Sequence, residues 1–199
     1  MGVISNGTTL LDAGALDSGI ATGAMTLLST VTASSSATVS FASGITSTYK
    51  EYIFKFYDVH PSADAADLTV NFRDGSSAYD ATKTSSFFWA YHSEDDSDTT
   101  LNAASSNDLA QGTGVQPISS NPGYDNDQAC SGTLHLFDPA STTFVKHFMA
   151  VSNSTEPGNY SINSYASGYC NVTAAIDGVQ FKFESGNIDS GTFKMYGVK

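Results

Sequence analysis

The stretch Ala175–Lys199, AIDGVQFKFESGNIDSGTFKMYGVK, decides the fold of this chain. Two runs in it alternate apolar with polar residues, and Ser, Gly, Asn and Asp residues separate them. The apolar members are Val179, Phe181, Phe183, Phe193 and Met195. A period of two places one face of a β-strand against a core. The stretch therefore predicts an antiparallel hairpin with one buried face, whose second strand closes a sheet.

The same alternation recurs through residues 24–174, and no segment has a helical period. Tyr49–Val59 has bulky residues on both faces, which predicts a central strand covered on both sides. Asp138–Ser141 marks a hairpin turn, and the polar region 93–129 is either a functional loop or holds another irregular strand. With about ten strands, we expect an all-β fold, an antiparallel β-sandwich that is jelly-roll-like.

Residues 1–23 differ from the sandwich domain predicted at 24–199. Their apolar residues are isolated, and Gly14, Gly19 and Gly23 break any regular element. The segment is either a disordered tail or an extended N-terminal arm that orders along a partner, with its apolar side chains in separate small pockets. For an arm, the anchoring residues are Val3, Ile4, Leu10, Leu11, Leu16 and Ile20.

The composition excludes several partners. Of the 199 residues, 40% are hydrophobic, which is enough for a core, and the net charge is -12. A surface of this sign repels phosphate backbones, so we expect no nucleic-acid binding. No apolar run reaches the roughly 18 residues of a membrane span, and no signal peptide is visible. Cys130 and Cys170 match no metal or redox spacing; they are either a disulfide or, as we expect, two free thiols.

No catalytic signature stands out, so we expect no enzyme and no cofactor. The four histidines, at positions 60, 92, 135 and 147, lie outside metal-binding or carboxylate-paired motifs, although His135 and His147 could approach each other across a hairpin. Glu94–Asp98 offers oxygen ligands of the kind that calcium prefers, but its spacing is not that of an EF-hand. A solvated acidic loop is the alternative.

The aromatic run 87–91, FFWAY, is the strongest candidate surface. Phe87, Trp89 and Tyr91 share one face of a strand, and Phe88 and Ala90 share the other. One face belongs to the core, and the other needs a second layer, a subunit contact or a sugar ring. Trp89 and Tyr91, together with the region 93–129, are therefore a candidate interface or glycan platform.

Four segments resemble a family of small virion structural proteins from tailed, mainly marine, bacteriophages. They are ISNGTTLLDAGALDSG (4–19), LLSTVTASSSATVSFASGITSTYKEYIFKFYDVHP (27–61), SGTLHLFDPASTTFVKHF (131–148) and SGNIDSGTFKMYGVK (185–199). The resemblance implies a non-enzymatic capsid decoration (cement) or head-fibre protein on the virion exterior, assembled in the host bacterial cytoplasm. Its partners would be the major capsid protein or another virion protein, and itself as a homotrimer.

Two alternatives stay open. A tail-fibre or tail-tip module would recognise host surface glycan through Trp89 and Tyr91. A free-standing carbohydrate-binding or hydrolytic jelly roll is the other, and the missing signal peptide and paired-acid motif argue against it.

Overall fold

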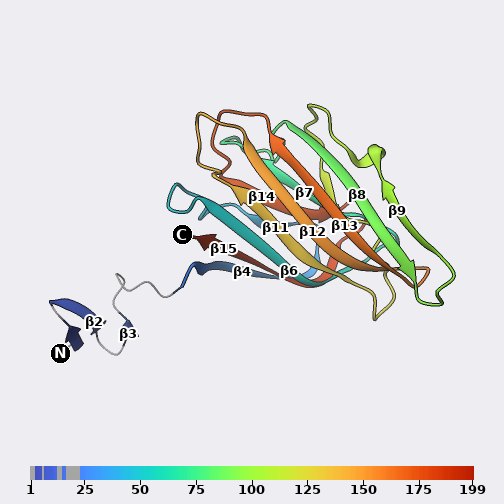
Figure 1. The fold of residues 1–199 in the computed structure, drawn as a ribbon, viewed down its shortest axis with the longest axis horizontal. Helices are drawn as coiled ribbons and strands as arrows, with labels where there is room; N and C mark the ends of the chain where they lie inside the picture. The colour runs from blue at the N-terminus through green and yellow to red at the C-terminus, as the bar shows by residue number, and fades with distance from the viewer. Residues whose placement is uncertain (1–2, 6, 13–14, 17–22) are drawn as a thin grey trace.

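The computed structural model describes residues 3–5, 7–12, 15–16 and 23–199 (Figure 1). Regular structure in this part is β-strand, apart from one 3-10 turn at Ser105–Asn107. An eight-stranded and a four-stranded sheet pack as a sandwich, and three short strands near the N-terminus form a third sheet. The prediction of an all-β antiparallel sandwich is confirmed, with twelve strands in the two packed sheets.

Every strand pairing in the two packed sheets is antiparallel. The large sheet has the order β4 (Met25–Ser36), β15 (Ile188–Val198), β6 (Glu51–Pro61), β11 (Cys130–Phe137), β12 (Lys146–Glu156), β13 (Tyr160–Cys170), β8 (Lys83–Ser93) and β9 (Thr99–Ala103). The small sheet has the order β10 (Gln116–Ser119), β7 (Leu68–Arg73), β14 (Gly178–Phe183) and β5 (Val39–Phe41).

The pairings follow the winding of a jelly roll. β4 pairs with β15, β5 with β14, β6 with β11 and β7 with β10, so early strands pair with late ones in nested order. This is the pattern of one long hairpin rolled into two sheets. Two inserted pairs, β8–β9 and β12–β13, extend the large sheet past β11. The large sheet is therefore wider than the small sheet that covers it.

The C-terminal stretch corrects one prediction. Both strands form with the expected buried faces, but β14 belongs to the small sheet and β15 to the large one, so they are not a hairpin. Gly186, with φ +72°, lies in the connection between them. Phe181 and Phe193 meet across the core with ring centroids 5.1 Å apart. Alternation shows which face is buried, and strands with one buried face pack equally well across a core.

β6 is central, as predicted, between β15 and β11. Its inward side chains Tyr52, Phe54 and Phe56 are fully buried, whereas Tyr57 on the other face is 39% exposed. The expectation of cover on both sides is therefore wrong, because no second layer among the described residues covers the outer face of the large sheet. The predicted β11–β12 hairpin is confirmed, and the region 93–129 contains β9 and β10.

Serine hydroxyls fix the edge strand β10 onto the large sheet. Ser152 Oγ donates to the carbonyl of Ile118 and Ser154 Oγ to that of Ser120, both at 2.7 Å. The Ser120 N–H donates to Ser164 Oγ at 3.0 Å. These bonds satisfy backbone groups that an edge strand would otherwise bury without partners. They set the position of Ser120, where the candidate site begins.

The N-terminal segment forms β1 (Val3–Ser5), β2 (Thr8–Asp12) and β3 (Ala15–Leu16), which pair antiparallel in chain order. The expectation that this segment lacks regular elements is wrong over these residues. Glycine helps to turn the chain here: Gly7, with φ +80°, lies between β1 and β2. Figure 1 shows this sheet away from the sandwich.

Candidate functional site

The aromatic run lies on β8, in the part of the large sheet that the two inserted pairs create. Phe87 faces inward and is 2% exposed, and Trp89 and Tyr91 follow it on the same face as partly exposed side chains. β10, at the edge of the small sheet, ends at Ser119. The inner face of β8 is therefore core at Phe87 and becomes the wall of an open groove at Trp89.

Two hollows adjoin at Trp89. One, of about 200 Å³, is lined by Trp89, Tyr91, Ser120, Asn121, Glu156, Tyr160 and Ile162. The other, of about 410 Å³, is lined by Asp67, Trp89, Asn102, Ala103, Ala104, Ser105, Ser106, Asn107, Ser120 and Asn121. Because Trp89, Ser120 and Asn121 line both, we treat the hollows as one feature and name it the Trp89 groove.

Three aromatic rings form the apolar wall of the Trp89 groove. The rings of Trp89 and Tyr91 stack with centroids 5.4 Å apart and planes 23° apart. Tyr160 on β13 meets Tyr91 edge-on, with centroids 5.0 Å apart. The Tyr91 hydroxyl donates to Asp98 Oδ2 at 2.6 Å, which raises the pKa of Tyr91. Contacts among the rings and this hydrogen bond hold the wall in one arrangement.

Asp67 joins the polar walls of the groove. Its Oδ2 accepts a hydrogen bond from Asn107 Nδ2 at 3.1 Å, and its Oδ1 accepts one from the Asn121 backbone N–H at 2.8 Å. Asp67 as a whole residue is only 8% exposed. Burial raises the pKa of Asp67 to about 6, while the hydrogen bonds from Asn121 and Asn107 oppose the rise. The buried carboxylate of Asp67 thus holds together two segments of the region 93–129, one at Asn107 and one at Asn121.

The groove offers hydrogen-bonding groups and negative charge. Asn102, Asn121 and Ser120 supply amide and hydroxyl groups, and Glu156 and Asp67 supply carboxylates. Among the described residues that line it, none is a lysine, arginine or histidine. The groove therefore suits a ligand with hydroxyl or amide groups and disfavours an anion.

The sequence found only part of this groove. Trp89 and Tyr91 were predicted, and the structure places both in it. Tyr160, Asp67 and the three asparagines were missed, because Asp67 lies 40 positions from Asn107 and 54 from Asn121. The sequence did predict that the region 93–129 joins Trp89 and Tyr91 in one surface. Asn102, Asn107 and Asn121 all lie in that region, so this prediction was the only indication of them.

The predicted anchoring residues fall in the N-terminal sheet. Val3 and Ile4 lie on β1, Leu10 and Leu11 on β2 and Leu16 on β3, whereas Ile20 lies outside the described residues. Leu11 is the register partner of both Val3 and Leu16, so three of these positions form one row across the sheet. Val3 and Ile4 are 54% and 64% exposed.

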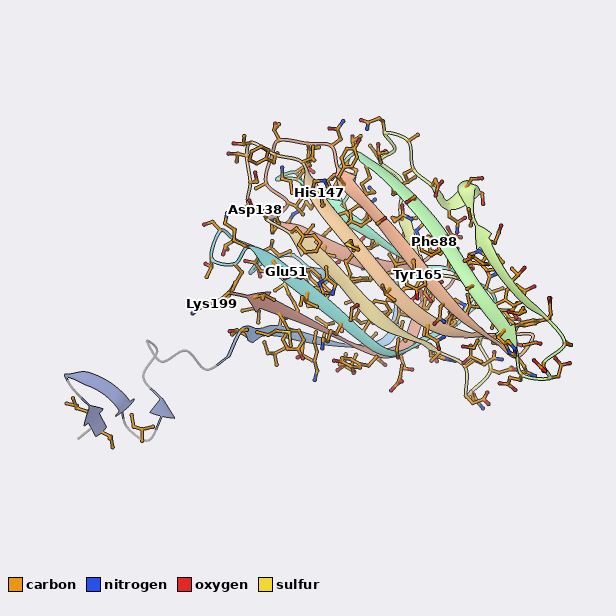
Figure 2. The ribbon with its side chains drawn as sticks, viewed as in Figure 1. Glu51, Phe88, Asp138, His147, Tyr165 and Lys199 are labelled. Carbon is orange, nitrogen blue, oxygen red and sulfur yellow. The ribbon has the colours of Figure 1, made fainter. Side chains whose placement is uncertain are left out.

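The outer face of the large sheet is a second exposed apolar surface. Phe88 and Tyr165 stack there with ring centroids 4.9 Å apart, and Figure 2 shows them on neighbouring strands. Val151 and Met149 on β12 are exposed beside them. The sequence assigned one face of β8 to the core without saying which, and placed the candidate interface or glycan platform at Trp89 and Tyr91. In the structure those two residues share the face of buried Phe87, and the fully outward face of β8 carries Phe88.

The histidines form two carboxylate pairs that the sequence did not predict. His135 Nδ1 lies 2.6 Å from Glu51 Oε1, and His92 Nε2 lies 3.1 Å from Asp96 Oδ1. His135 is opposite Met149 in the β11–β12 register, so it does not pair with His147. No group of three or more His, Cys, Asp or Glu side chains that could hold a metal ion occurs within the part of the chain that the structure describes.

Both cysteines are free and buried. Burial raises the pKa of Cys130 and of Cys170 to about 12, so neither is a thiolate at neutral pH. Lys83 and Lys146 flank Cys170 in register, and Lys83 Nζ donates to Asn71 Oδ1 at 2.5 Å and to the Ala81 carbonyl at 2.7 Å. This cluster is closed off from solvent and has the character of a polar part of the core.

Comparisons with protein-family models, with curated proteins and with solved structures find no match for the chain. No helix among the described residues has the length and apolar character needed to cross a membrane. The functional argument therefore depends on the Trp89 groove, the N-terminal sheet and the resemblance of the sequence segments.

Proposed function

We propose that this chain is a non-enzymatic bacteriophage virion protein, a capsid decoration (cement) or head-fibre protein that attaches through its N-terminal segment. The observation that carries the proposal is the row of Val3, Leu11 and Leu16 on a sheet of its own, with Val3 and Ile4 exposed. Val3 and Ile4 are exposed apolar residues that would gain burial on a partner surface. The four sequence segments that resemble virion proteins support the same role.

The partners in this proposal are the major capsid protein, or another virion protein, and further copies of the chain. Phe88, Met149, Val151 and Tyr165 on the outer face of the large sheet favour a contact between copies, for which we propose a homotrimer. Several linked subunits raise the local concentration of each N-terminal anchor, so weak single contacts add up to firm attachment. The net charge of -12 suits the outer surface of a particle.

Removal of residues 1–23 tests the anchor. We expect the 24–199 fragment to keep the sandwich, because the core cluster lies within 33–195. It should no longer co-sediment with particles that lack the native protein, whereas the full chain should do so. Circular dichroism checks the fold of the fragment. Undiminished co-sedimentation by the folded fragment would rule out the N-terminal anchor.

A matched variant keeps the length of the segment and changes only its apolar character. Val3→Ser with Ile4→Ser leaves the glycines and the sandwich unaltered, and we expect it to weaken co-sedimentation. The control, Leu101→Ser, changes a residue on β9 that is 73% exposed and should bind particles as the full chain does.

The Trp89 groove favours a second candidate function, a tail-fibre or tail-tip module that recognises host surface glycan. The groove combines three aromatic rings with amide, hydroxyl and carboxylate groups. Particle location separates the two candidates, because a decoration protein lies on the head and a glycan-recognising module at the tail.

A further inference from the structure

We propose that the Trp89 groove is a binding site for an uncharged oligosaccharide of at least two sugar units, and that Asp67 positions its polar walls. This inference rests on the second candidate function and names the ligand class of its site.

The lining chemistry matches a sugar. A pyranose ring presents C–H groups on its faces and hydroxyl groups around its rim, so it needs an aromatic surface with hydrogen-bonding groups at the edge. Trp89, Tyr91 and Tyr160 supply the aromatic surface. Asn102, Asn121 and Ser120 lie beside it with amide and hydroxyl groups. Apolar walls with a few convergent polar groups are the usual form of a small-molecule site.

Charge narrows the ligand class. The carboxylates of Asp67 and Glu156 line the groove, Asp98 lies behind Tyr91, and no basic side chain is among the lining residues that the structure describes. A uronic acid, sialic acid or phosphorylated sugar would bring its negative charge against these groups without a cation to offset it. Neutral and N-acetylated sugars meet no such repulsion.

The shape of the groove sets the ligand length. Trp89 lines both a hollow of about 200 Å³ and a hollow of about 410 Å³. A single sugar would occupy one hollow, whereas a chain would pass over the indole ring and fill both. We therefore expect affinity to rise from monosaccharide to tetrasaccharide.

Asp67 is a positioning residue in this proposal. It holds Asn107 on one side of the groove and the backbone of Asn121 on the other. Burial disfavours the charged form of its carboxyl group and so raises the pKa of Asp67. A carboxyl group with a pKa perturbed in this way is characteristic of a functional site. Loss of its two hydrogen bonds would free the groove walls while leaving the aromatic surface in place.

The test uses the full chain and its own fluorescence. The chain has one tryptophan, so the emission of Trp89 reports the groove directly. We expect tetra-N-acetylchitotetraose or maltotetraose to change this emission saturably, and tetragalacturonic acid to bind at least about tenfold more weakly or not at all. Titration calorimetry with the same four-unit probes gives the affinities independently.

Variants connect the binding to the groove. Asn102→Ala, at an exposed position, and Asp67→Asn should each weaken the tetrasaccharide about tenfold, and Trp89→Phe should weaken it while preserving the fold. Phe144→Ala and Asn126→Ala, on exposed loops outside the Trp89 groove, are the matched controls and should bind as the unaltered chain does.

Three results would overturn the proposal: no binding of either uncharged tetrasaccharide at millimolar concentration, stronger binding of the acidic probe, or binding that the groove variants leave unchanged. The test is independent of the particle experiment, because removal of residues 1–23 leaves every groove residue in place. Saccharide binding that Asn102→Ala weakens supports the groove whatever the result of co-sedimentation.

Discussion

At the scale of single residues, Asp67 shows how one side chain can serve a site at a cost to stability. The residue is 8% exposed, and the pKa of its carboxyl group rises from 3.8 to about 6 because burial disfavours the charged form. The hydrogen bonds from Asn107 and Asn121 recover only part of that cost. An apolar residue would pack there without this cost but could not hold the two segments.

This cost predicts a pH dependence of stability. Between about pH 6 and pH 4 the folded chain holds a proton on Asp67 that the unfolded chain has released, so the stability due to this group rises as the pH falls. From pH 7 to pH 4, the native chain should gain about 2.5 kcal/mol relative to Asp67→Asn, because the pKa of Asp67 is about 6 in the folded chain and 3.8 in the unfolded chain. Urea unfolding of both proteins across this range measures the difference.

The control for this experiment is Asp64→Asn. It removes an exposed carboxylate from the connection between β6 and β7, which also contains Asp67. It should keep the pH dependence of the native chain. If Asp67→Asn and the native chain gave parallel stability curves, Asp67 would not carry the cost that its burial implies.

At the scale of elements, β10 depends on side-chain hydrogen bonds as well as on its pairing with β7. Ser154→Ala removes the donor to the buried Ser120 carbonyl and should lower the free energy of unfolding by about 1–2 kcal/mol. Ser86→Ala, on the exposed face of β8, should change it by less than about 0.5 kcal/mol. Urea unfolding measures both changes.

Ser154→Ala should also affect the Trp89 groove. Ser120 lines both hollows beside Trp89, so a looser β10 end should alter the emission of that single tryptophan. Unchanged stability and emission in Ser154→Ala would mean that pairing with β7 alone positions β10.

Strand positions were largely predictable from this sequence, and strand partners were not. Alternation located β6, β8, β14 and β15 and identified the buried faces of β14 and β15, because burial of one face imposes a period of two. It could not assign β14 and β15 to different sheets, since Phe181 and Phe193 would alternate identically in a hairpin. β4 and β15 are the first and last strands of the sandwich in chain order, yet they pair with each other. No local sequence pattern indicates this pairing.

The candidate site was likewise predictable where it depends on one strand, and not where it depends on how distant segments meet. Trp89 and Tyr91 were found because they belong to the aromatic run 87–91, which carries large rings on both faces of one strand. Asp67 and Tyr160 reach the groove from other elements, through pairings that are non-local in sequence. The N-terminal sheet was missed because its strands are only two to five residues long, too short for a period to show.

At the scale of the whole molecule, the chain presents three different surfaces. The N-terminal sheet has exposed Val3 and Ile4, the outer face of the large sheet has the stacked pair Phe88 and Tyr165, and the Trp89 groove opens on the inner face. In our account they serve attachment, contact between copies and ligand binding respectively. A particle protein that must hold a partner, pack with its copies and meet the exterior needs surfaces of these three kinds.

The most direct test of the central claim is a density map of the particle that carries this chain. Our account predicts the 24–199 sandwich in clusters of three on the outside of the head, with residues 1–23 lying against the capsid shell and the outer faces of the large sheets in contact. Density for the sandwich at the tail tip, or on the head with its N-terminal segment directed into solvent, would contradict it.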